Sequence, residues 1–180
     1  MSQILLGVSA SVSLYKACDL ASKLTQAGHS VRCAMTPNAA KLIAPQLFSA
    51  LTGRSAQSSE WGAEGRTAMD HIELARWADL VVVAPATASL CGRLAVGSAE
   101  DLLSTTLLAV EGTKPRILCP AMNPVMLANP AVSRNLEQLR EDGWEVLEPG
   151  VGHMACGEAG SGRLPEPADI LERVTARLST

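Results

Sequence analysis

Short, continuously apolar runs constrain the fold of this 180-residue chain more than any other feature. The clearest run is DLVVVA, from Asp79 to Ala84. A strand with one face in water alternates apolar and polar residues, whereas a strand buried on both faces is apolar along its length. The run therefore predicts a strand within a parallel sheet that is covered on both faces. Further strands are expected at Ile4 to Val8, Ser30 to Met35, Arg116 to Cys119 and Val146 to Leu147.

Helical patterns separate these strands. Leu14, Cys18, Ala21 and Leu24 follow helical spacing, and Gly28 is a good helix stop. The alternation of strands and helices predicts one three-layer α/β/α, Rossmann-like domain over residues 1–180. Other helices are expected at Pro37 to Leu51 with a new start at Pro45, Ile72 to Ala78, Thr87 to Ala95, Asp101 to Val110, Asn129 to Gly143 and around Ile170 to Leu178.

Composition excludes several functional classes. A net charge of −3 and a pI near 5.6 predict no general affinity for nucleic acid or anionic membranes. Aromatic residues make up only 3% of the chain, which disfavours a base-stacking surface. The N-terminal apolar run is short and no basic residue precedes it, so we expect a cytoplasmic protein without a signal peptide or membrane span.

The five cysteines form no C-x-x-C pair, so neither a metal site nor a disulfide framework is expected. Cys18, Cys33, Cys91 and Cys119 are interpreted as small buried apolar residues. Cys156 differs because it lies in a polar, glycine-rich segment.

Small and hydroxyl-bearing residues follow four of the expected strands. Ligands of parallel α/β sheets bind outside the carboxyl ends of the strands, where helix N-termini and hydroxyl groups suit a phosphate. Neither a G-x-G-x-x-G fingerprint nor a GK[ST] motif is present, so a mononucleotide with one phosphate fits best. The alternative for each turn is an ordinary helix cap. The four segments are Gly7 to Ser11, Thr36, Pro85 to Ser89 and Pro120 to Asn123.

Two side chains stand out beside these turns. His71 opens HIELARW, ahead of the DLVVVA strand, and is either structural or an acid/base group that reaches the cleft. Asn123 is either a turn residue before Pro124 or a neutral amide that holds a substrate carboxylate or amide. His29 and His153 receive no role.

Two segments are expected to be loops, Arg54 to Asp70 and Gly150 to Pro165. The second contains GHMACGEAGSGR, with Cys156 and Arg163. It is either a flexible surface loop or a lid that closes a thiol over the site.

Four segments together resemble the homo-oligomeric FMN-containing cysteine decarboxylases: HIELARWADLVVVAPATAS, EDLLSTTLLA, PAMNPVM and ACGEAGSGR. The resemblance covers nearly the full chain and implies a flavodoxin-like fold and FMN as the cofactor. It also implies an oligomer, usually a homotrimer and sometimes a dodecamer, with a site between subunits. The residues expected to bind FMN are Gly7, Ser9, Ala10, Ser11, Val12, Thr36, Thr87, Ala88, Ser89, Leu90 and Ala121.

The resemblance also implies roles in catalysis. Oxidation of a substrate cysteine to a thioaldehyde, by hydride transfer to flavin, would supply the electron sink for loss of CO2. His71 would serve oxidation and decarboxylation, and Cys156 would protonate the carbon after the hydride returns. Asn123 and Met122 would contact the substrate, with Arg76 and Arg163 as candidates for its phosphate or carboxylate.

Three departures from the family pattern are visible. The family often has glycine at Ala10, asparagine at Ser89 and tryptophan at Leu127. The first two affect details of flavin contact.

The expected activity is FMN-dependent decarboxylation of 4'-phosphopantothenoylcysteine in coenzyme A synthesis. Cys156 favours it, because the best-known peptide decarboxylases stop at the enethiol and lack this cysteine. Peptidyl-cysteine decarboxylases of antibiotic maturation remain an alternative, as does a non-catalytic flavin-binding regulator. A flavin prenyltransferase is more distant. Length does not separate the first two, since stand-alone versions of both occur.

Overall fold

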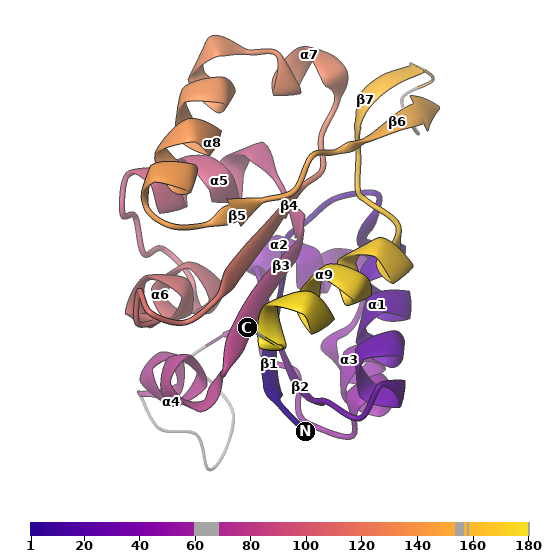
Figure 1. Ribbon diagram of the computed structural model, residues 1–180, viewed down its shortest axis with the longest axis vertical. Helices are drawn as coiled ribbons and strands as arrows, with labels where there is room; N and C mark the ends of the chain where they lie inside the picture. The colour runs from indigo at the N-terminus through magenta and orange to yellow at the C-terminus, as the bar shows by residue number, and fades with distance from the viewer. Residues whose placement is uncertain (60–68, 154–156, 158, 180) are drawn as a thin grey trace.

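The computed structural model describes residues 1–59, 69–153, 157 and 159–179. Its centre is a five-stranded parallel sheet in the order β2-β1-β3-β4-β5 (Figure 1). This order is that of flavodoxin-like folds and confirms the expected architecture. The strands are β1 (Gln3–Val8), β2 (Ser30–Met35), β3 (Leu80–Ala86), β4 (Arg116–Pro120) and β5 (Glu145–Val146).

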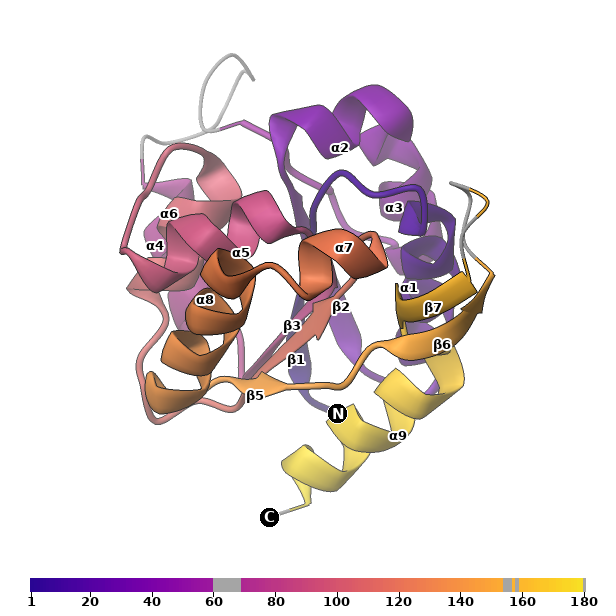
Figure 2. The same cartoon turned by 90° about the horizontal axis from the view of Figure 1, so that it is seen from above.

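Helices cover both faces of the sheet, as Figures 1 and 2 show. On one face, α1 packs against α3 and α9, and on the other, α6 and α8 pack beside α4 and α5. The helices of the first face are α1 (Leu14–Gln26), α3 (Pro45–Thr52) and α9 (Pro167–Leu178). Those of the second are α4 (Asp70–Trp77), α5 (Ala88–Ala95), α6 (Leu102–Ala109) and α8 (Pro130–Glu141).

Burial on both faces explains why the strands are continuously apolar. Ile4 and Leu6 of β1 belong to the core beneath α1, while Leu5 belongs to the core on the opposite face. In β3, Val82 shares the first core and Val81 the second. Every residue of β3 is buried, so ligands can reach this part of the sheet only at the ends of its strands and not on its faces.

The segment from Gly150 to Pro165 contains a β-hairpin, and the prediction of a loop there was wrong. Its strands β6 (Gly150–His153) and β7 (Ala159–Arg163) pair antiparallel. The hairpin docks on the turn between β4 and the short helix α7 (Pro124–Leu127), where the Met122 amide donates to the Gly162 carbonyl at 3.0 Å. Two short helices, α2 (Pro37–Leu42) and α7, lie beside the carboxyl ends of the strands (Figure 2).

The segment expected as a mobile loop is partly tied to the sheet. Gln57 exchanges backbone hydrogen bonds with β2, accepting from Met35 at 2.7 Å and donating to Cys33 at 2.9 Å. Residues 60–68 of this expectation lie outside the described residues. The helix expected from Ile72 begins earlier, at Asp70.

Three of the four cysteines expected to be buried are so, and Cys18 is half-buried. Burial raises the pKa of the Cys91 thiol to about 12 and that of Cys33 and Cys119 further still. These thiols stay protonated at neutral pH and act as packing groups.

Candidate functional site

The carboxyl ends of four strands converge on one pocket of about 600 Å³, here called the strand-end pocket. Its size lies within the range of roughly 300–1,000 Å³ common for small-molecule sites. Residues from all four predicted segments line it, so the sequence correctly placed them together. The expected cofactor residues on its wall are Ser9, Ala10, Ser11, Val12, Thr36, Thr87, Ala88, Ser89 and Ala121.

Ser9 ties together the two strand ends at the centre of the sheet. Its hydroxyl donates to the Pro85 carbonyl at 2.8 Å and accepts from the Thr87 amide at 2.9 Å. These bonds join the end of β1 to the end of β3, next to the point where strand order reverses and a crevice opens. Ser9 therefore shapes the wall of the strand-end pocket, with its own hydroxyl engaged in holding the backbone.

Two threonines of the pocket are also helix caps, as the alternative interpretation allowed. Thr36 accepts from the Ala39 amide at 3.2 Å, and Thr87 accepts from the Leu90 amide at 3.4 Å. A hydroxyl that accepts in this way still carries a hydrogen that it can donate. Capping and binding of an anion are thus compatible at both positions.

The helix starts at the strand-end pocket favour one phosphate, although Glu100 and Asp101 lie on another part of its wall. The first turns of α1, α2 and α5 contain no acidic residue. Helix dipoles and backbone amides there favour an anion. Hydroxyl groups line this part of the wall, and the apolar side chains of Ala121 and Met122 lie along another part. A phosphate joined to a flat aromatic group, as in FMN, fits this donor set.

A partly buried ion pair forms another part of this wall, and sequence reasoning missed it. Arg93 donates to Asp101 at 2.7 Å, and their side chains are 18% and 9% exposed. Asp101 also caps α6 by accepting from the Ser104 amide at 2.8 Å. The motif EDLLSTTLLA thus fixes an arginine from the preceding helix beside the pocket. The sequence signal for this ion pair was Asp101 at the expected start of a helix, shortly after a helix that carries Arg93.

A second pocket of about 310 Å³ adjoins the first and is here called the hairpin pocket. It contains three of the predicted substrate residues, Met122, Asn123 and Arg163, on the β4–α7 turn and β7. The two pockets share Ser11, Val12, Ala121 and Met122. Ligands in the two pockets would therefore contact the same four residues and lie next to each other. The remaining lining comes from Ser13, Tyr15, Lys16, His153, Gly162 and Leu164.

Asn123 holds a fixed orientation on the wall of the hairpin pocket. Its Oδ1 accepts from the Val125 amide at 2.7 Å and from the Met126 amide at 3.4 Å, which caps α7. The interpretation of Asn123 as a turn residue before Pro124 is therefore confirmed. The same bonds hold the amide group in place for contact with a ligand.

Lys16 was not singled out from the sequence, yet it is the charged group most enclosed beside the hairpin pocket. Its side chain is 9% exposed and its Nζ lies 2.7 Å from Oε1 of Glu166. The Leu164 carbonyl lies at 3.5 Å from the same Nζ. The signal was available, because Lys16 falls one helical turn before Leu20 on the buried face of α1.

Several predicted site residues lie elsewhere in the chain. Gly7 is inside β1, where an added Cβ would lie 2.9 Å from Leu103 Cδ1. Leu90 is buried in the core under α5. Neither lines either pocket. Cys156 lies outside the described residues.

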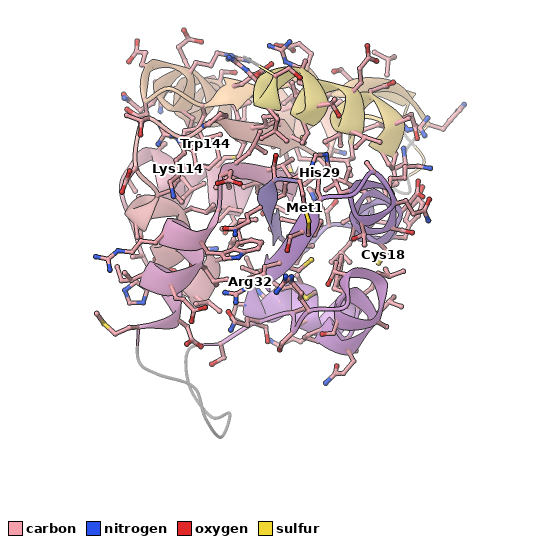
Figure 3. The ribbon with its side chains drawn as sticks, turned by 60° about the horizontal axis from the view of Figure 1, so that its bottom comes forward. Met1, Cys18, His29, Arg32, Lys114 and Trp144 are labelled. Carbon is pink, nitrogen blue, oxygen red and sulfur yellow. The ribbon has the colours of Figure 1, made fainter. Side chains whose placement is uncertain are left out.

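His71 and Arg76 are both on α4 and also line neither pocket. Lys114 donates to the Arg76 carbonyl at 2.8 Å, and Lys114 directly precedes β4. Arg76 therefore lies at the amino-end edge of the sheet, opposite the pockets; Figure 3 brings this edge forward. Arg76 thus lines neither pocket of its own chain, and its contact with a substrate phosphate or carboxylate stays a prediction. In Figure 1, α4 is at the bottom of the molecule and α7 at the top.

Within the described ranges, no helix is long and apolar enough to cross a membrane. In the same part of the chain, no group of three His, Cys, Asp or Glu side chains is placed to hold a metal ion.

Comparison with known proteins gives consistent matches over the whole chain. The family model described as Flavoprotein matches residues 1–179. The chain is 45% identical over 169 residues to the coenzyme A biosynthesis bifunctional protein CoaBC of Bacillus subtilis (strain 168). That match covers 94% of this chain and 41% of the bifunctional protein, so the chain spans about two fifths of its relative.

Solved structures agree with this match. A cysteine-to-serine mutant of PPC decarboxylase, complexed with pantothenoylaminoethenethiol, superposes with a TM-score of 0.85 at 32% identity, covering 99% of both chains. The FMN-dependent cysteine decarboxylase SpaF superposes with a TM-score of 0.80 at 30% identity, covering 99% of this chain and 98% of that one.

Proposed function

The chain belongs to the Flavoprotein family, and from this premise we propose that it is an FMN-dependent decarboxylase of 4'-phosphopantothenoylcysteine. The product would be 4'-phosphopantetheine, an intermediate of coenzyme A synthesis. The observation that carries the proposal is the shared wall of the two pockets. A flat redox group in the strand-end pocket would lie against a small thiol-bearing ligand in the hairpin pocket.

The strand-end pocket supplies the groups that FMN needs. Ser11, Thr36, Thr87 and Ser89 provide hydroxyls near helix starts for the phosphate. Ala121 and Met122 provide an apolar surface for the ring. When bound, FMN would accept a hydride from the substrate cysteine and later return it to the decarboxylated product. The protein's own contribution is to bind, orient and shield the reacting groups.

The hairpin pocket supplies the groups that the substrate needs. Asn123 would hold the cysteine-derived end through its amide, since that side chain is fixed by its cap bonds. Lys16 and Arg163 place two positive charges on the same pocket, where an acidic substrate would be attracted. This pattern supports the relative's substrate, because phosphopantothenoylcysteine carries both a carboxylate and a phosphate.

His71 would act in the pocket of a second copy of the chain. It lies on α4 and lines neither pocket of its own chain. As an acid/base group near neutral pH, it suits proton movement during oxidation and decarboxylation. We therefore propose a homo-oligomer, a trimer or a dodecamer built of trimers, in which α4 of one copy completes the site of another.

Cys156 would supply the proton that the unsaturated product takes up together with the returned hydride. Decarboxylation moves the C–CO2 electron pair onto the C=S bond and leaves an enethiolate. A saturated product then requires one hydride and one proton, and the thiol of Cys156 would supply that proton. Without a donor, release would stop at the enethiol.

Product analysis of Cys156→Ser tests this assignment. Purified protein is incubated with phosphopantothenoylcysteine, and CO2 and product masses are followed. Wild-type protein should release the saturated thiol 4'-phosphopantetheine, whereas Cys156→Ser should release CO2 while the product with two fewer hydrogens accumulates. Unchanged saturated product from the variant would refute the role of Cys156, and absence of CO2 from wild-type protein would refute the proposed function.

A peptidyl-cysteine decarboxylase is the second candidate. The similarity to SpaF leaves room for it, because this FMN-dependent cysteine decarboxylase superposes almost as well as the PPC decarboxylase. Its chemistry would use the same pockets up to the enethiol. The alternatives differ in what lies beyond the cysteine, which the hairpin pocket must accommodate.

A further inference from the structure

Three charged groups from three separate parts of the chain meet at the hairpin pocket. Lys16 comes from α1, Arg163 from the end of β7 and Glu166 from the residue that precedes α9. The same carboxylate oxygen, Glu166 Oε1, lies 2.7 Å from Lys16 Nζ and 3.6 Å from Arg163 Nη2. Lys16 and Arg163 line the pocket, whereas Glu166, whose side chain is 58% exposed, does not.

The environment keeps Glu166 ionised. The hydrogen bond from Lys16 holds the pKa of Glu166 below its usual range, and the charges of Lys16 and Arg163 act in the same direction against a smaller effect of burial. A carboxylate at the start of α9 is also favoured by the helix dipole.

Each cation depends on Glu166 to a different degree. The nearly buried Lys16 ammonium has one further described hydrogen-bond acceptor, the Leu164 carbonyl at 3.5 Å. Arg163 is also held by packing, since its side chain crosses Gly152 so closely that an added Cβ would lie 2.6 Å from Nη1. Loss of the carboxylate would thus release Lys16 more than Arg163.

We propose that Glu166 is a positioning residue that holds Lys16 and Arg163 on the wall of the hairpin pocket for an anionic group of the substrate. The inference rests on the proposed function for its substrate. The triad carries a net charge of +1, so a carboxylate or a phosphate monoester would be attracted to it. Glu166 connects α1 and the hairpin, and it acts on the ligand only through these two cations.

Kinetics of three variants test this role. Glu166→Gln keeps the shape of the side chain and removes its charge, Glu166→Asp restores the charge, and Glu172→Gln on exposed α9 surface is the matched control. We expect Glu166→Gln to raise KM for phosphopantothenoylcysteine about tenfold or more, with kcat within about threefold, as for the loss of a charge-assisted contact. Glu166→Asp should recover most of the loss, and Glu172→Gln should match wild type.

The dephosphorylated substrate, pantothenoylcysteine, distinguishes the two sources of negative charge. If the triad serves the phosphate, the rise in KM disappears with this substrate; if it serves the cysteine carboxylate, the rise persists. A KM equal to that of Glu172→Gln, or a fall in kcat at unchanged KM, would overturn the proposal. Thermal unfolding of all variants separates positioning from a general loss of fold.

A binding measurement separates failure of this inference from failure of the proposed function. The chain has four lysines, at positions 16, 23, 41 and 114, so ¹³C-methylated lysines give few NMR signals. The Lys16 signal, assigned with Lys16→Arg, should shift on titration with inorganic phosphate in wild type and shift less at the same phosphate concentration in Glu166→Gln. Equal shifts in both proteins would overturn the role of Glu166 even if neither substrate is decarboxylated.

Discussion

At the scale of single residues, Ser9 shows how a small polar group on a pocket wall shapes the site through the backbone groups that it binds. The sequence placed it correctly at a strand end, and its hydroxyl then proves to be engaged by Pro85 and Thr87. No local pattern indicates which of several serines in a turn will bridge to a strand 76 residues away. That choice depends on strand order, which only the assembled sheet determines.

We predict that Ser9→Ala costs about 1–3 kcal/mol of unfolding free energy, because the half-buried Thr87 amide loses its acceptor and the Pro85 carbonyl keeps only the Ser9 amide as a donor. Loosening of the β1–β3 junction should also weaken FMN binding. Urea unfolding and flavin titration measure both effects. Ser30→Ala is the matched control, since its buried hydroxyl has no hydrogen-bond partner among the described residues. Equal losses in the two variants would contradict the role given to Ser9.

At the scale of elements, the strands and long helices were predictable and the hairpin was not. Buried strands carry a strong apolar signal, and α1 and α9 have clear apolar stripes. The hairpin strands GVGH and AGSGR lack apolar alternation and β-branched runs, so nothing local distinguishes them from a loop. Their order comes from pairing with each other and from docking on the β4–α7 turn.

Gly160 allows the hairpin to dock closely. An added Cβ there would lie 3.0 Å from Pro124 Cγ, and the proline ring cannot turn away. We predict that Gly160→Ala raises the substrate KM several-fold with little change in thermal stability, because the hairpin closes one side of a pocket rather than the core. Gly150→Ala, whose added Cβ meets nothing closer than 3.8 Å, should behave as wild type. The same KM for both variants would contradict the docking role.

Glu145 of β5 pairs with Arg173 and Arg177 of α9, and this pairing predicts that stability depends on pH. Burial alone would raise its pKa, but hydrogen bonds and charges from Arg173 and Arg177 outweigh burial and hold the pKa below its usual value. A lowered folded pKa gives stability that is complete above the unfolded value near 4.5 and is lost as pH falls through the folded value.

We therefore expect Glu145→Gln to cost about 1 kcal/mol of unfolding free energy at neutral pH, the scale of a partly exposed ion pair. The difference from wild type should shrink as pH falls below 4.5. Urea unfolding across this range measures it, with Glu148→Gln as the control because Glu148 is 85% exposed. A difference that stays constant down to low pH would show that the charge of Glu145 is not responsible.

At the scale of the whole molecule, the position of His71 requires a second chain if it is catalytic. The sequence motif around His71 suggested a role, but its own chain places α4 away from both pockets. A single sequence carries no clear pattern for contacts between copies. Only the folded chain shows whether a residue such as His71 lies at the pocket of its own chain or away from it.

Co-expression of His71→Asn and Asn123→Ala chains tests this arrangement. Each variant alone should be inactive, because every site lacks one essential group. Random mixing in a cyclic trimer should restore about a quarter of wild-type activity, since a site needs an intact Asn123 from one chain and an intact His71 from its neighbour. No recovery in mixed trimers whose assembly is verified by native mass spectrometry would contradict a shared site.

A comparison of two substrates tests most directly whether the protein decarboxylates phosphopantothenoylcysteine. Purified FMN-loaded protein is given phosphopantothenoylcysteine and a peptide ending in cysteine at equal concentrations, and CO2-loss products are quantified by mass. The two charged groups at the hairpin pocket predict turnover of phosphopantothenoylcysteine to the saturated product, with kcat/KM at least about tenfold above that for the peptide. Decarboxylation of the peptide alone, with release of the enethiol, would contradict the account.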